Sequence, residues 1–392
     1  MKLPAFKDLK ALNEHLFEQA HAVSIYMPCS EGGKIKLEEN LQKELKSYLD
    51  TVRQHLKDDG TPETEADRIL KYGYDQLRSR DLWHHQGNGL ALFMSPETCT
   101  YFHLPDPVHA HHTIGRKFHL RHLAPALEDQ QSSAYLLHLS RQQIQLFQVT
   151  PIHIRAYALE TEAPKSLQDV LKYYQLDREE LHNEAGLPAG AQANTHGADP
   201  DRDQEYVYIE RYLKRVHDGV HAYLNDTETP VILSGTHDMQ HRFRKQNHHL
   251  HLLDQGIEGN HDGARPEQFH EKAQSILKAM QQKHKQYYFD EYRNLQGTGK
   301  ATAQPGEIVS AAYDGRVKVL FADGFTQWPG ITRPGQHEVQ FHEHNSMAVD
   351  DLLDQAAVQT VLNRGLYFEI QDESESLPYQ EEGVQANAIF RW

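Results

Sequence analysis

The chain has 392 residues, of which 24% are charged and 38% are hydrophobic. This length allows two or three domains with separate cores, and the spread of apolar residues along the chain excludes a disordered protein. The formal net charge of −16 at pH 7 disfavours non-specific binding to nucleic acid, because phosphate binding requires many lysines and arginines. Any contact with nucleic acid is therefore expected to use local basic patches.

Neither a membrane span nor a disulfide framework is predicted. No apolar run approaches the roughly 18 residues that cross a bilayer, and the first 20 residues have the pattern of an amphipathic helix rather than a secretion signal. Cys29 and Cys99 are too few for a disulfide framework and do not form a Cys-x-x-Cys pair. We therefore expect a cytoplasmic protein with no membrane contact and two idle thiols.

Residues 1–128 are predicted to form an N-terminal α+β domain. Leu9, Leu12 and Leu16 indicate a first helix, and a longer apolar stripe at helical spacing indicates a second. The expected helices cover residues 7–16, 37–56 and 66–79, and the expected strands cover residues 22–28, 89–95, 99–105 and 116–123.

Residues 132–296 are predicted to form a mixed α/β middle domain. Three strands in quick succession, at residues 134–140, 143–149 and 152–159, indicate an antiparallel meander. A strongly amphipathic helix begins at about Asp203, a strand follows at 230–236, and a second long helix has Phe269 to Met280 on its apolar face. This order, with strands first and then alternating helices and strands, predicts a domain of mixed α/β class.

Residues 297–392 are predicted to form an α/β/α sandwich. A stretch rich in Gly, Thr and Pro at residues 294–307 marks the boundary. Beyond it, helices and strands alternate, with expected helices at 307–315 and 349–365 and expected strands at 317–322, 338–344, 366–370 and 384–392.

Several segments resemble archaeal and eukaryotic class-one release factors and Pelota. They include "VILSGTHDM", the run "YYFDEYRNLQGTGK" at the end of the second long helix, and the tail "GVQANAIFRW". "VSIYMP" and "LWHHQGNGLALFMS" in the first domain are similar to the bacterial branch, the bacterial archaeo-eukaryotic release-factor-like family, whose relatives include Balon. This resemblance implies an RNase-H-like middle domain and a C-terminal domain similar to kink-turn RNA-binding ribosomal proteins. It also implies the ribosome, through rRNA and tRNA, as partner and a translational GTPase such as elongation factor Tu as a second partner.

Release factors hydrolyse peptidyl-tRNA with a Gly-Gly-Gln tripeptide in the loop before the long middle-domain helix. This chain has Gly190-Ala191-Gln192 in that loop and no Gly-Gly-Gln elsewhere. Alanine rarely adopts the positive φ that glycine allows, so the sequence predicts a protein without hydrolase activity. Gln192, Asn194, His196 and Arg202 are the candidate contacts to rRNA or tRNA, and the alternative is a solvent-facing loop with no partner.

The stretch "HRFRKQNHH" supplies a second candidate contact to RNA. Arg242, Arg244 and Lys245 lie here in an otherwise acidic chain, and arginine can bind phosphate with two hydrogen bonds and stack on bases. The alternative is an ordinary solvated face of charged residues.

Histidine-rich motifs raise the question of a metal site. Alternate residues of a strand share a face, so pairs of these histidines could face one ion. The motifs contain His109, His111 and His112; His248, His249 and His251; and His342 and His344. None has a cysteine or a third ligand at a diagnostic spacing, which favours surface or edge-strand histidines, with neither a metal nor a cofactor expected.

Nuclease chemistry is not expected of the middle domain. The expected first strand has His138 and Ser140 where a two-metal site requires a carboxylate. "GNGLALF" and "QGTGK" lack the spacing of a phosphate-binding loop, and the second is interpreted as an interdomain turn.

The sequence thus predicts a three-domain factor that binds the ribosome in rescue, stress response or hibernation without hydrolysing peptidyl-tRNA. Two alternatives remain open. The first is an active peptidyl-tRNA hydrolase that uses Gln192 despite Ala191. The second is a protein of the same fold that binds other proteins away from the ribosome.

Overall fold

The chain forms two compact units, one made of residues 1–131 and 283–392 and the other of residues 132–282. Both are built from helices and mixed or antiparallel sheets, which confirms the predicted mixed α/β class. No helix in the described part of the chain has the length and apolar run that a membrane span needs. The computed structural model describes residues 2–17, 22–31, 34–84, 87–106, 108–127, 133–151, 153–159, 163–172, 200–224, 229–332, 339–342, 349–370, 376–381 and 383–392.

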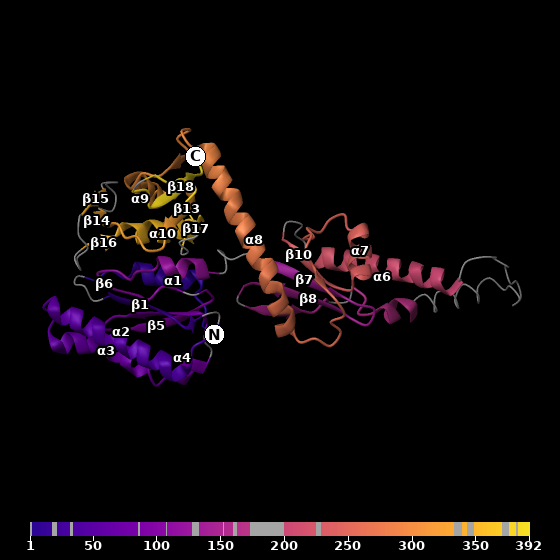
Figure 1. The fold of residues 1–392 in the computed structure, drawn as a ribbon, viewed down its shortest axis with the longest axis horizontal. Helices are drawn as coiled ribbons and strands as arrows, with labels where there is room; N and C mark the ends of the chain where they lie inside the picture. The colour runs from indigo at the N-terminus through magenta and orange to yellow at the C-terminus, as the bar shows by residue number, and fades with distance from the viewer. Residues whose placement is uncertain are drawn as a thin grey trace, which may run out of the picture. The chain divides into compact units, whose positions relative to one another are not determined.

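The N-terminal part of the first unit is a four-stranded antiparallel sheet with the order β5-β4-β1-β6. Helices α2 and α3 cover one face and α1 lies on the other (Figure 1). Its elements are α1 (Phe6–Glu14), β1 (Ala22–Pro28), β2 (Ser30–Glu31), β3 (Lys34–Ile35), α2 (Glu38–Asp58), α3 (Glu63–Gln76), α4 (Arg80–His84), β4 (Gly89–Met94), β5 (Cys99–Leu104), β6 (His111–Gly115) and η1 (Arg121–Ala126).

The central strand β1 is buried on both faces. Val23, Ile25 and Met27 pack against α2 and α3, whereas Ala22 and Tyr26 belong to the core on the opposite face. This division follows from the alternation of side chains along a strand. It also explains why "AVSIYM" is apolar at nearly every position.

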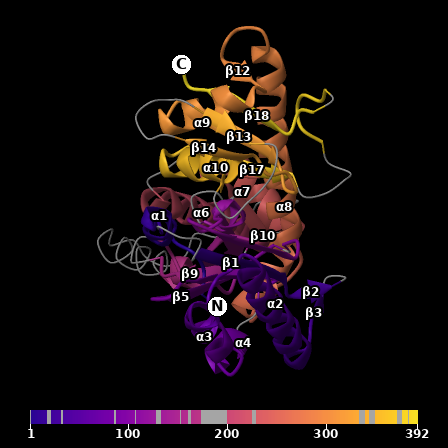
Figure 2. The ribbon, with the colours of Figure 1, turned by 90° about the vertical axis from the view of Figure 1, so that its left-hand side faces the viewer.

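The C-terminal part of the first unit is an α/β/α sandwich, as predicted. Its sheet has the order β12-β18-β13-β17, with β13 and β17 parallel and the other pairs antiparallel. Figure 2 shows the sheet between α9 and α10 on one side and α8 on the other. Its elements are α8 (Pro266–Leu295), β12 (Ala301–Thr302), α9 (Pro305–Tyr313), β13 (Val317–Asp323), β14 (Pro329–Thr332), β15 (Val339–Phe341), β16 (Asp350–Asp351), α10 (Leu352–Leu362), β17 (Leu366–Ile370) and β18 (Ala386–Phe390).

The strand predicted at residues 116–123 is wrong. The edge strand is β6, which pairs with β1 from Tyr26↔His111 to Ala22↔Gly115. After it the chain turns inward, and residues 121–126 form the 3-10 helix η1. The carboxylate of Asp354 accepts hydrogen bonds from the backbone N–H groups of Leu120 and Arg121, both at 2.6 Å. These two N–H groups are therefore satisfied without pairing to a neighbouring strand.

The second unit contains a five-stranded mixed sheet with the order β11-β10-β7-β8-β9. The predicted antiparallel meander is present in β7, β8 and β9, and β10 runs parallel to both β7 and β11. This mixed sheet fits the RNase-H-like domain that the resemblance implies. Its elements are β7 (Ala134–Leu139), β8 (Ile144–Val149), β9 (Ile154–Tyr157), α6 (Pro200–Leu224), β10 (Val231–Gly235), α7 (His237–Gln246), β11 (Ile257–Glu258) and the part of α8 up to Gln282.

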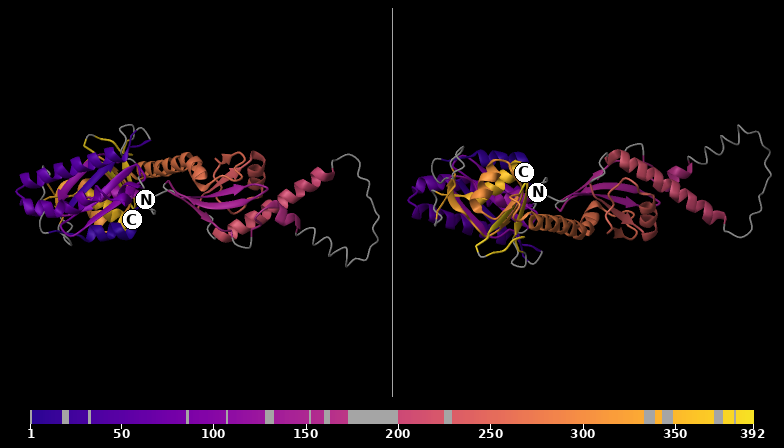
Figure 3. Two further views of the ribbon diagram at one scale, coloured as in Figure 1. Left: turned by 90° about the horizontal axis from the view of Figure 1, so that it is seen from below. Right: turned by 90° about the horizontal axis from the view of Figure 1, so that it is seen from above.

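Helices cover both faces of this sheet. Leu137 and Leu233 pack against α6 and α7, whereas Leu136 and Ile232 pack against α8. Figure 3 shows the magenta strands between the pink helix α6 and the orange helix α8. The apolar stripe of α6 is buried as predicted, apart from exposed Tyr206.

The two cysteines are free, and burial raises the pKa of each to about 12. At neutral pH their thiolate fraction should be roughly 10³-fold below that of an exposed thiol with a pKa of about 8.5. We expect dithionitrobenzoate to leave both thiols unmodified for many minutes in the native protein and to titrate both in denaturant. Rapid labelling of the native protein would contradict this.

Candidate functional site

The loop that carries three of the predicted contact residues lies outside the described residues. Gln192, Asn194 and His196 belong to it, and the structure begins again at Pro200 with the first residue of α6. Arg202 lies in the first turn of α6, and its side chain is also outside the described part. The described element is therefore the helix of 25 residues that immediately follows the loop.

Helix α6 is held firmly along one side. Ile209, Leu213, Val216 and Val220 are buried in the core of the second unit, and the Tyr212 hydroxyl donates a 2.6 Å hydrogen bond to the carbonyl of Ser140. The part of α6 from Ile209 onward is therefore fixed by the fold.

The predicted basic patch lies on α7, a helix that the sequence analysis did not predict. Arg242 binds the carboxylate of Asp238 through its Nε at 2.8 Å, lies 3.4 Å from Glu210, and stacks over the Tyr206 ring at 4.3 Å. Arg244 donates to the backbone carbonyls of Leu253 and Asp254 at 2.6 and 3.1 Å. Both arginines thus make contacts within the second unit, whereas Lys245 is exposed and stays the accessible cation of the three.

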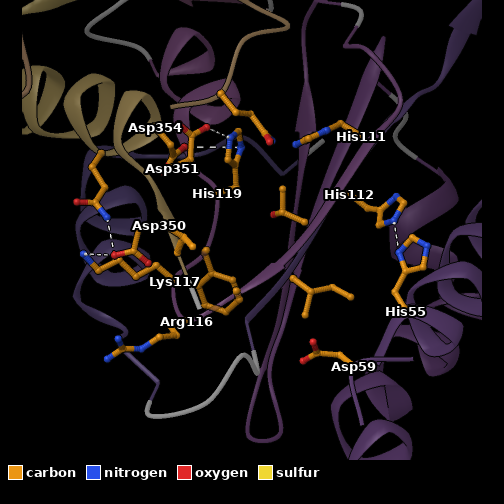
Figure 4. Close-up of a pocket in the computed structure, with 17 residues that line it drawn as sticks. His55, Asp59, His111, His112, Arg116, Lys117, His119, Asp350, Asp351 and Asp354 are labelled. Carbon is orange, nitrogen blue, oxygen red and sulfur yellow. Dashed lines mark hydrogen bonds and ion pairs between the residues drawn. The ribbon is translucent and has the colours of Figure 1, made fainter. Parts of the chain in front are cut away.

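A groove of about 620 Å³ lies between the two parts of the first unit. One wall is β6 and the segment that follows it, and the other includes the start of α10. Figure 4 shows His112 directed toward His55 and His119 directed toward Asp351. The ring nitrogens of His112 and His55 are 3.2 Å apart, and Lys117 lies 3.8 Å from Asp350.

Beneath this groove lies a buried polar cluster. His119 approaches Asp351 with its Nε2 at 3.1 Å, and His122 approaches Glu369 with its Nδ1 at 2.5 Å. Arg121, only 1% exposed, donates to the carbonyl of Gly324 at 2.9 Å. The cluster joins residues 119–122 to side chains more than 200 positions later in the chain.

Burial and neighbouring charges set the protonation of this cluster. Burial raises the pKa of Asp354. At Asp351 the effect of burial is outweighed by the hydrogen bond from His119 and by the charge of Arg121, which together lower the pKa to about 2. Burial lowers the pKa of His111 to about 3 and also lowers that of His122, despite the adjacent Glu369. His111 and His122 are therefore neutral rings at pH 7.

Short-range motifs did not reveal this cluster. His111 and His112 do lie on an edge strand, as expected, but their partners come from elsewhere: His119 and His122 from the segment predicted to be a strand. His249 does not share a strand with His251, since residues 248–250 form a bend, and His344 lies outside the described residues. The usable signal was the density of histidine, since residues 111–122 contain four, of which His111, His119 and His122 form the cluster.

The second unit and the segment that follows it are similar to a known protein family. Residues 135–316 match the model of a release factor family, in agreement with the motifs that this stretch contains. The matching model is that of Bacterial archaeo-eukaryotic release factor family 3. None of the curated proteins matches the chain.

Solved structures similar to the chain include three translation-related proteins. An archaeal translation termination factor, aRF1, is 14% identical, with 100% of this chain and 99% of that chain covered and a TM-score of 0.25. Archaeoglobus fulgidus Pelota is 8% identical over 100% and 94%, with a TM-score of 0.32. Dom34 of S. cerevisiae, described as interacting with Hbs1, is 12% identical over 75% and 72%, with a TM-score of 0.31. TM-scores this low do not establish a shared arrangement of the whole chain.

Proposed function

We propose that this protein is a translation factor that binds the ribosome and does not hydrolyse peptidyl-tRNA. One observation carries the proposal: a chain matching a release factor family over residues 135–316 has Gly190-Ala191-Gln192 in the loop that enters α6. The methyl group of Ala191 restricts the backbone beside the glutamine that would position the attacking water. The loop then serves as a contact to rRNA or tRNA.

Ribosome rescue, stress response and hibernation are the roles that fit such a factor. The proposed contacts to RNA are Gln192, Asn194, His196 and Arg202, together with the basic patch of α7, where Lys245 is the exposed member. A translational GTPase such as elongation factor Tu is the proposed delivery partner.

Sedimentation with ribosomes across a salt series tests the binding. We expect the protein to pellet with ribosomes at low salt and to be released as salt rises, because a protein with a net charge of −16 must bind RNA through a few local cations. Lys245→Ala should weaken binding and reduce the slope of log K against log salt by about 1. Lys272→Ala, which removes an exposed lysine of α8, is the matched control. Failure of the intact protein to pellet at any salt concentration contradicts the proposal.

A peptide-release assay on the same ribosomes separates the proposal from the hydrolase alternative. The intact protein and Gln192→Ala should both release no more peptide than buffer does. Release by the intact protein that Gln192→Ala abolishes would establish the hydrolase instead.

A further inference from the structure

Three histidine side chains of the first unit converge at the buried end of the groove. His111 is the first residue of β6, His119 lies four residues beyond its end, and His122 is in η1. One ring nitrogen from each lies within 4.8 Å of the other two, and this is the only such group of three or more possible ligands found among the described residues. All three histidines come from one stretch of 12 residues, so local folding of the N-terminal part brings them together.

Two of the three rings present a buried nitrogen for which the described part of the chain offers no hydrogen bond. Nε2 of His111 and Nδ1 of His119 are shielded from solvent and have no hydrogen-bond partner among the residues that the structure describes. Asp354 Oδ1 is 3.7 Å from Nδ1 of His119, but it already accepts the backbone hydrogen bonds of Leu120 and Arg121. A buried polar atom left unpaired costs about 1–3 kcal/mol. Both atoms therefore point to a missing ligand.

In two of the three histidines, a carboxylate binds the ring nitrogen on the side away from the cluster. Nε2 of His119 donates to Asp351, the N-cap of α10, which leaves Nδ1 with its lone pair. Nδ1 of His122 donates to Glu369 of β17, which leaves Nε2 with its lone pair. A carboxylate that fixes the tautomer of a histidine in this way is the usual second partner of a histidine that binds a metal.

We propose that His111, His119 and His122 bind a divalent ion of the zinc class. A ligand set of imidazoles alone is preferred by Zn²⁺ and by the ions of Cu, Ni and Fe, whereas Mg²⁺ and Ca²⁺ prefer oxygen ligands. Zn–N bonds of about 2.0–2.1 Å in a tetrahedron separate the nitrogens by roughly 3.4 Å, so the rings close by up to about 1.4 Å on binding. Three protein ligands leave a fourth position, and His111 and His119 also line the groove. The site thus has an exchangeable position open to water or a small anion.

Zinc binding by the full-length protein tests this site. Protein stripped with dipicolinate is titrated with Zn²⁺ by calorimetry, and Co²⁺ is added separately as a spectroscopic probe. We expect one tight Zn²⁺ per chain and the intense visible absorption of tetrahedral Co²⁺. His111→Ala should weaken Zn²⁺ binding by at least ~100-fold, beyond the 10–100-fold typical of outer partners. His111 is the ligand of choice because its removal leaves the contacts of His119 with Asp351 and of His122 with Glu369 in place.

Two control variants distinguish this site from the histidine-rich surface. His112→Ala removes the next residue of β6, whose ring faces His55 instead, and His249→Ala removes a ring stacked on His221 in the second unit. Both should bind one Zn²⁺ as the parent does. If His111→Ala is poorly folded, a saturable rise in the melting temperature of the parent at one Zn²⁺ per chain supports the site. Absence of stoichiometric Zn²⁺ binding by the parent, or equal affinity in folded His111→Ala, overturns it.

Discussion

Replacing Arg121 with methionine is expected to lower the free energy of unfolding of the first unit by about 3–5 kcal/mol. The guanidinium is 1% exposed, donates to the carbonyls of Gly324 and Asp323, and lies 4.0 Å from Glu369. Methionine conserves much of the volume but removes the positive charge that offsets the buried Glu369 carboxylate. Removing one member of a buried ion pair is strongly destabilising, because the charge of the other member is no longer compensated.

Tryptophan fluorescence can follow this effect in the intact chain. The three tryptophans, Trp83, Trp328 and Trp392, all belong to the first unit, so urea unfolding followed at their emission reports that unit. Arg68→Ala removes an arginine whose side chain is 60% exposed and should change the free energy by at most about 0.5 kcal/mol. Adding Glu369→Gln to Arg121→Met should recover part of the loss, because it removes the negative charge that Arg121 no longer offsets. If the urea midpoint of unfolding of Arg121→Met equals that of the parent, the buried cluster does not stabilise the unit.

Gly235→Ala is expected to destabilise the second unit by at least about 3 kcal/mol. Gly235 ends β10 with φ at +147°, and a Cβ there would lie 2.4 Å from the carbonyl oxygen of Leu139 in the paired strand β7. That oxygen is backbone in the centre of the sheet and cannot move aside without breaking the pairing. The penalty therefore adds a clash to an unfavourable backbone conformation.

Gly263→Ala separates these two causes. Gly263 also has a positive φ, at +77°, but no neighbouring atom lies within 4 Å of the added Cβ, so only the backbone strain of about 1 kcal/mol should remain. Hydrogen exchange of the peptides containing β7 and β10 measures both variants. Similar exchange rates in Gly235→Ala and Gly263→Ala would contradict the clash with Leu139.

The pattern of apolar residues predicted most of the helices and strands, because burial of one face of an element places apolar residues at regular spacing. The apolar run of β1, the meander of β7 to β9 and the apolar stripes of α2 and α8 all reappear at the expected residues. Helix α1 is shorter than expected: it ends at Glu14, and Leu16 is 59% exposed. The helix α7 escaped prediction since its ten residues expose charged and polar groups and bury only Met239, Gln240 and Phe243.

The histidine cluster could not be predicted from spacing within any motif. The ring positions of His119 and His122 depend on Asp351 and Glu369, which lie more than 200 residues further along the chain. Residues 116–123 have a strand-like apolar pattern, yet a carboxylate of α10 replaces the ladder partners of their backbone. The local apolar pattern cannot show that a distant side chain, and not a neighbouring strand, accepts the backbone hydrogen bonds.

The hydrogen bond between Leu120 and Asp354 spans 234 positions of the chain. At about 5–20 residues per second, roughly 10–50 s elapse between synthesis of the two partners. During that interval the second unit is made in full, while the backbone N–H groups of Leu120 and Arg121 have no Asp354 carboxylate to bind. The segment around η1 therefore cannot complete its buried hydrogen bonds until α10 is made, and we expect a chaperone to protect the nascent chain mainly during this interval.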